Sequence, residues 1–171
     1  MKINLVLAPE QDVATLLKYK KQAPNQLLLL GKLSQLAGLN VLIFDQPELV
    51  ERFNRPLTFN SLFVMGEPKG KLVHQVSFKS IGNDDEHINN LLEKMALNGV
   101  LAQQNDGKSE YMLWTFWDDA DDLALFIDSQ NYQQLHDWMR QPFSTTYHNV
   151  ENIDQISLTH KMRDTDKEWW G

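Results

Sequence analysis

The sequence predicts an α+β protein built from two consecutive βαββαβ halves. Alternating and helical segments follow one another in the same order in both parts of the 171 residues, and a turn-forming stretch of Gly, Pro and Lys at 66–71 separates them. The apolar fraction, 42%, is sufficient for a packed core. We expect residues 1–66 to form the first half, 67–71 a linker, 72–160 the second half and 161–171 a tail.

The first half begins with an alternating segment at 3–8, which predicts a strand closed by Pro9. A helix is expected over 10–20, because Val13, Leu16 and Leu17 share one helical face. The remaining elements expected in this half are strands at 26–31, 40–45 and 62–65 and a short helix at 48–54.

The second half repeats this order with a clearer pattern. Residues 72–79 alternate, which predicts a strand that carries His74, Val76 and Phe78 on one face. A helix is expected next, because Ile88, Leu91, Leu92 and Met95 recur at helical spacing. The later elements are a hairpin of 100–104 and 110–117 around Asp106-Gly107, a helical region at 120–139 with a break near 129–131, and a closing strand at 144–150 or 155–159. Each half is therefore expected to be a ferredoxin-like unit.

Charge and composition exclude several classes of function. A formal net charge of −7 argues against binding to nucleic acid or to anionic membranes. The chain has no cysteine, so disulfides and thiolate chemistry are excluded. The apolar runs are too short for a signal peptide or a membrane span, and we expect a cytoplasmic protein.

The histidines and the acidic run leave two interpretations open. His136 lies on the apolar stripe of the last predicted helix with Tyr132, which suits either a metal-ligating imidazole or a histidine at the edge of the stripe. His74 shares a face with apolar residues, so a satisfied core histidine is the alternative to a catalytic one. We interpret the acidic run at 118–122 as a helix start rather than a cation site, because it lacks the spacing of a calcium loop.

The stretch from Tyr111 to His136 carries a more specific pattern: a hydrophobic strand ending in Trp117, an acidic helix start, and a break containing Ser129 before a helix that carries His136. It resembles the central stretch of the antibiotic biosynthesis monooxygenase (ABM) superfamily, and its spacing is similar to that of haem-degrading monooxygenases of the IsdG type. The layout also resembles the two-part haem-degrading monooxygenase HmoB and the TRAP-like regulatory proteins. This resemblance implies a dimeric α+β barrel fold in which the two halves form a pseudo-dimer within one chain. A monomer is therefore expected, with a conventional homodimer as the alternative.

The resemblance also implies a site. The haem-degrading members use an Asn, a Trp and a His, and the His is the axial iron ligand. Carried over by motif, the His falls on His136, the Trp on Phe126, and the Asn on His74 or Gln75, of which strand alternation favours His74. Tyr132, on the same stripe as His136, is expected to line the same pocket. His136 alone keeps the residue type of the family.

Two functions follow from the resemblance. One is a monooxygenase that acts on haem, or that oxidises a small hydrophobic molecule in the barrel cavity without a cofactor. The other is a haem-binding or ligand-binding regulatory protein without turnover. The retained His136 favours the enzyme, and the phenyl ring of Phe126 in place of an indole favours the binding protein.

Overall fold

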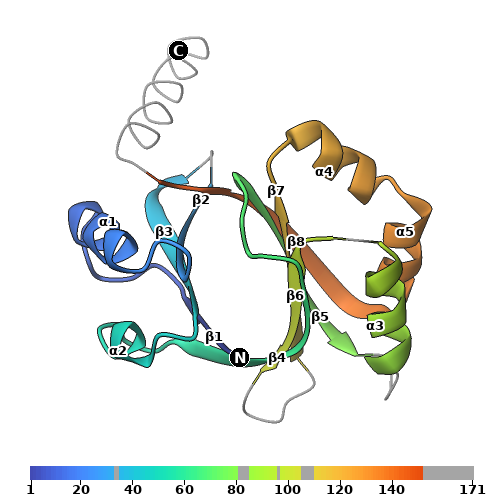
Figure 1. Ribbon diagram of the computed structural model, residues 1–171, viewed down its shortest axis with the longest axis horizontal. Helices are drawn as coiled ribbons and strands as arrows, with labels where there is room; N and C mark the ends of the chain where they lie inside the picture. Colours follow the sequence, from blue (N-terminus) through green and yellow to red (C-terminus); the bar gives the residue numbers. More distant parts are fainter. Residues whose placement is uncertain (33–34, 81–84, 96, 105–109, 152–171) are drawn as a thin grey trace. The chain divides into compact units, whose positions relative to one another are not determined.

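The computed structural model describes residues 1–32, 35–80, 85–95, 97–104 and 110–151 (Figure 1). The chain forms two compact units. We call Asn4–Leu57, together with the chain from Tyr147, the first unit, and Met1–Ile3 with Thr58–Thr146 the second unit.

The order of elements confirms the predicted βαββαβ repeat. The first half contains β1 (Lys2–Val6), α1 (Val13–Gln22), β2 (Leu27–Lys32), β3 (Gln35–Phe44), α2 (Pro47–Val50) and β4 (Leu57–Met65). The second half contains β5 (Leu72–Ser80), α3 (Asp85–Lys94), β6 (Gly99–Gln104), β7 (Glu110–Trp117), α4 (Ala120–Ile127), α5 (Gln130–Asp137) and β8 (Met139–Asn149). Between β7 and β8 the second half has two helices, α4 and α5, where a minimal βαββαβ unit has one. The predicted break near 129–131 separates them.

The strands hydrogen-bond in the order β1-β3-β2-β8-β5-β7-β6-β4, which is the order of a closed barrel. Each half contributes the same sequence of neighbours, β4-β1-β3-β2 in the first and β8-β5-β7-β6 in the second. The halves are joined by the antiparallel pairs β2–β8 and β4–β6. This topology confirms the α+β, ferredoxin-like pseudo-dimer that the sequence predicted.

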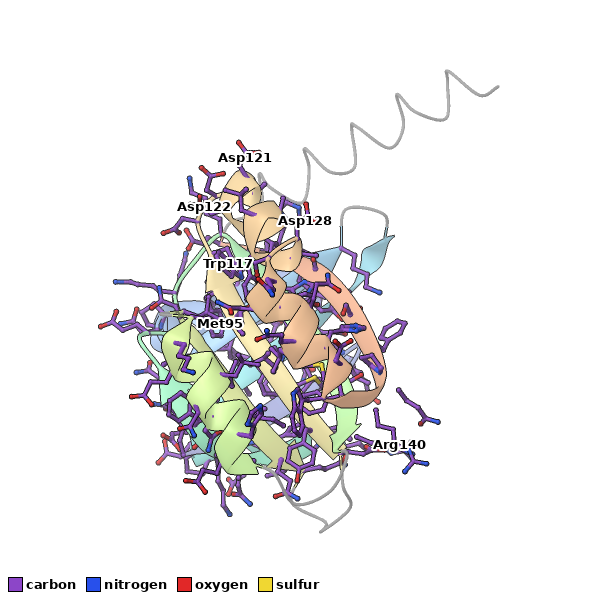
Figure 2. All side chains as sticks on the ribbon, turned by 90° about the vertical axis from the view of Figure 1, so that its right-hand side faces the viewer. Met95, Trp117, Asp121, Asp122, Asp128 and Arg140 are labelled. Atoms are coloured by element: carbon purple, nitrogen blue, oxygen red, sulfur yellow. The ribbon has the colours of Figure 1, made fainter. Side chains whose placement is uncertain are left out.

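The core of the second unit lies between its strands and its helices, and Figure 2 shows α3, α4 and α5 along one face of the strand layer. Val76 and Phe78 of β5 pack there against Leu92 of α3 and Leu135 of α5, and all four are buried. The helical stripe and the strand alternation predicted from the sequence therefore meet in a single core. Burial of four large apolar side chains of this kind stabilises the unit by about 1.5–3 kcal/mol each.

Ser129 breaks the predicted helical region into α4 and α5. Its Oγ accepts a hydrogen bond from the Tyr132 N–H at 3.2 Å and donates one to the Phe126 carbonyl at 2.6 Å, so it ends one helix and caps the next. At the other end α5 stops at Asp137, whereas the sequence pattern extended the helix to Met139, which instead begins β8. His136 consequently lies in the last turn of its helix.

Three sequence predictions lie outside the described residues: the turn at Asp106-Gly107, the alternative closing strand at 155–159 and the tail at 161–171. The strand at 144–150 is present but starts five residues earlier, at Met139. None of the helices in the described ranges combines the length and hydropathy that a bilayer crossing needs.

Candidate functional site

His74 projects from β5 toward the helices of the second unit and is 4% exposed. Its Nδ1 lies 2.9 Å from the Thr146 Oγ1 of β8, and its Nε2 lies 3.1 Å from the Tyr132 Oη of α5. Both ring nitrogens are therefore engaged by neutral hydroxyl groups. In a neutral imidazole one nitrogen donates and the other accepts, so one hydroxyl is an acceptor and the other a donor.

Burial lowers the pKa of His74 to about 4, because removing the ring from water disfavours its charged form. The imidazole is therefore neutral at neutral pH. A neutral imidazole between two hydroxyl groups can donate a hydrogen bond to one and accept one from the other, but it supplies no positive charge. The structure thus shows a buried His74 with both ring nitrogens hydrogen-bonded, as the core-histidine interpretation expected.

Aromatic rings from β7, α4 and α5 form a continuous row beside His74. The centroids of Trp117 and Phe126 are 4.9 Å apart, those of Phe126 and Tyr132 also 4.9 Å, and those of Tyr132 and His136 5.9 Å. We call these four residues the aromatic row. Figure 2 shows Trp117 on the strands beneath the helices that carry the other three. Phe126 and Tyr132 are buried, so this row is a water-poor environment.

His136 ends the aromatic row and is half-buried. Within the described part of the chain its ring nitrogens make no hydrogen bond, and its contact is with the ring of Tyr132. An imidazole that is partly shielded and uncommitted is suited to ligate a metal centre. His74, whose two nitrogens are occupied, is not suited to that role.

Gln75 lies on the opposite face of β5 from His74. Its Oε1 accepts a hydrogen bond from the Nε1 of Trp114 at 2.8 Å, and Trp114 is fully buried. The structure therefore brings together His74, Phe126, Tyr132 and His136, and it leaves Gln75 apart from them. It also adds Thr146, which the sequence pattern did not single out.

Among the described residues, His136 offers one uncommitted imidazole, which could serve as the single protein ligand of a haem iron. Among the described residues, no group of three or more His, Cys, Asp or Glu side chains is placed to hold a metal. A haem iron is different, because the porphyrin supplies four nitrogens and the protein needs to supply one axial ligand. The free imidazole of His136 beside aromatic rings meets that requirement.

The acidic run and His87 have structural explanations. The Asp119 side chain caps α4, accepting a hydrogen bond from the Asp121 N–H at 2.7 Å, and Figure 2 shows Asp121 and Asp122 pointing away from the helix layer. This confirms the helix-start interpretation. His87 of α3 is exposed, with its ring 4.2 Å from that of Trp138.

The first unit has a surface cleft of about 670 Å³ that contains none of the predicted site residues. Two of its residues, Ala8 and Arg55, have positive φ angles of 45° and 52°. It is lined by Leu7, Ala8, Pro9, Glu10, Gln11, Asn54, Arg55 and Leu57.

No family model matches the sequence, and no curated protein matches it significantly. Solved structures do match over nearly the whole chain. A heme-degrading enzyme, LmHde, from Listeria monocytogenes has a TM-score of 0.60 at 13% identity, covering 88% of this chain and 100% of that one. An uncharacterized ferredoxin-fold protein from the same species, related to antibiotic biosynthesis monooxygenases, has a TM-score of 0.60 at 14% identity, covering 89% and 96%.

A major regulator of staphylococcal pathogenesis is also similar, with a TM-score of 0.56 at 14% identity, covering 88% of this chain and 99% of that one. At these identities the likeness establishes the fold. The chain therefore has the two-part fold of the ABM superfamily, as its sequence motif predicted, and one fold accommodates both an enzyme and a regulator among these structures.

Proposed function

We propose that this ABM-fold chain is a monooxygenase that takes haem as cofactor and substrate, with His136 as the axial iron ligand. One observation carries the proposal: His136 presents an uncommitted, half-buried imidazole at the end of the aromatic row. The fold supports it, because a heme-degrading enzyme shares the same two-part architecture.

Each residue of the cluster has a distinct part in this proposal. His136 binds the iron, and Phe126 with Trp117 provides apolar surface that excludes water. Tyr132 provides the one hydroxyl group of the aromatic row, and the hydrogen bond from this hydroxyl to Nε2 of His74 fixes its orientation. Bound haem would supply the activation of oxygen, which none of these side chains can perform alone.

A second function is favoured by two departures from the haem degraders. The ring at position 126 is a phenyl rather than an indole, and the position expected to hold Asn is occupied by His74, whose nitrogens are both engaged. These features favour a protein that binds haem, or another small hydrophobic molecule, without turning it over. The similarity to a regulator is compatible with that function.

An absorbance titration with haemin, followed by ascorbate, separates these functions. We expect a Soret shift that saturates at one haemin per chain, because one chain supplies the whole cluster, and a slow decay of the band once ascorbate is added. A stable band would identify the binding protein instead. The absence of any shift would remove haem from both functions and leave a small hydrophobic molecule as the ligand class.

A further inference from the structure

Three side chains from three elements form a continuous hydrogen-bonded chain in the second unit. Thr146 on β8 is exposed, His74 on β5 is 4% exposed, and Tyr132 on α5 is 5% exposed. The two links are 2.9 Å and 3.1 Å long, which are good hydrogen-bond distances. The chain therefore leads from the surface to a buried phenol that lies against Phe126 and His136.

We infer that Thr146, His74 and Tyr132 form a proton relay that carries protons from solvent to the aromatic row. Each member has both a donor and an acceptor, which such a relay requires. Within the described residues His74 is the one hydrogen-bond partner of the Tyr132 hydroxyl, so that hydroxyl keeps capacity to bond to a ligand. The inference rests on the proposed monooxygenase function, because that reaction consumes protons.

Insertion of one oxygen atom from O₂ into a C–H bond, with release of the other as water, consumes two electrons and two protons. An external reductant, such as ascorbate, supplies the electrons. The ascorbate monoanion releases one of the two protons with its electrons, and the relay supplies the other: Tyr132 gives up its O–H proton to the reacting oxygen and receives one from Nε2 of His74. In the same movement Nδ1 takes the proton of Thr146, and solvent restores it. Because burial disfavours the imidazolium, the shift is concerted and the ring changes tautomer without becoming charged.

The alternative is that these hydrogen bonds only hold β8, β5 and α5 together. Two variants and one control separate the two cases. Thr146→Val removes the surface hydroxyl with little change in shape, and Tyr132→Phe removes the buried hydroxyl but keeps the ring in the row. Thr145→Val is the matched control, because successive residues of a strand point to opposite faces.

The first measurement needs no haem: solvent exchange of the His74 ring N–H, followed by NMR in protein labelled with ¹⁵N-histidine. A relay predicts that Thr146→Val slows this exchange severalfold, whereas Tyr132→Phe and Thr145→Val do not slow it. Faster exchange in Thr146→Val would show that the hydrogen bond between Thr146 and His74 only shields the ring from solvent, and it would overturn the relay. Unchanged exchange in Thr146→Val would overturn it too.

The second measurement uses the haemin-loaded chain with ascorbate, in H₂O and in D₂O. Thr146→Val and Tyr132→Phe are each expected to slow turnover on the order of 100-fold, the usual contribution of a positioned proton-transfer group, and Thr146→Val should leave haemin affinity unchanged. A chain that fails to bind haemin would contradict the proposed function, while the exchange measurement would still decide the relay. Normal turnover in both variants, with normal haemin binding, would overturn the relay alone.

Discussion

Replacing His136 with alanine is expected to weaken haemin binding by about 100-fold or more, because even the loss of a group that merely supports a metal ligand costs 10–100-fold. His136 makes no hydrogen bond within the described residues and is half-buried, so its loss should lower the free energy of unfolding by no more than about 1 kcal/mol. Soret titrations of the wild type and His136→Ala measure the first effect, and chemical denaturation measures the second.

The matched control is His87→Ala, which removes an imidazole from a neighbouring helix of the same unit. Its haemin affinity should equal that of the wild type. Imidazole added to His136→Ala should restore part of the Soret shift, since it can occupy the vacated axial position. Equal haemin affinity in His136→Ala and the wild type would rule out the axial-ligand role.

Acidification is expected to cost the chain about 3 kcal/mol of stability through His74 alone. The pKa of its imidazole is about 4 in the folded chain and 6.5 in the unfolded chain, so the unfolded state binds more protons between these values. Stability from this group is present in full above pH 6.5 and is lost as the pH falls toward 4. Each pKa unit corresponds to 1.36 kcal/mol, and the shift is about 2.5 units, which gives this magnitude.

The comparison that isolates this effect is His74→Gln, which keeps a polar, non-titrating side chain at the position. Between pH 7.5 and pH 4.5, the free energy of unfolding should fall by about 2.5 kcal/mol less in His74→Gln than in the wild type. His87→Gln, at an exposed position, should behave as the wild type does. The same loss on acidification in His74→Gln and the wild type would show that His74 is protonated as readily in the folded chain as in the unfolded one.

Local patterns predicted the parts of the site that lie on one element. Strand alternation placed His74 with Val76 and Phe78 on the helix side of β5, and it placed Gln75 on the other side, where it bonds to Trp114. These predictions succeed because the side-chain period of a strand is two and depends on no distant residue.

Contacts between distant elements could not be predicted in the same way. Thr146 is 72 residues from His74, and no local pattern shows which residue of β8 lies opposite the imidazole. The register of two strands is set by the packing of the whole sheet rather than by either strand. The end of α5 was also missed, because Met139 continues the apolar helical spacing although it belongs to β8.

In the proposed function, haem lies on the aromatic row against His136. Gallium protoporphyrin, a diamagnetic analogue of haem, allows its position to be mapped by NMR through the ring-current shifts that it induces. We expect the largest shifts at Phe126, Tyr132 and His136, and much smaller shifts at the cleft residues of the first unit, such as Leu7 and Leu57. Largest shifts at the cleft, with none on the aromatic row, would contradict the site assigned here.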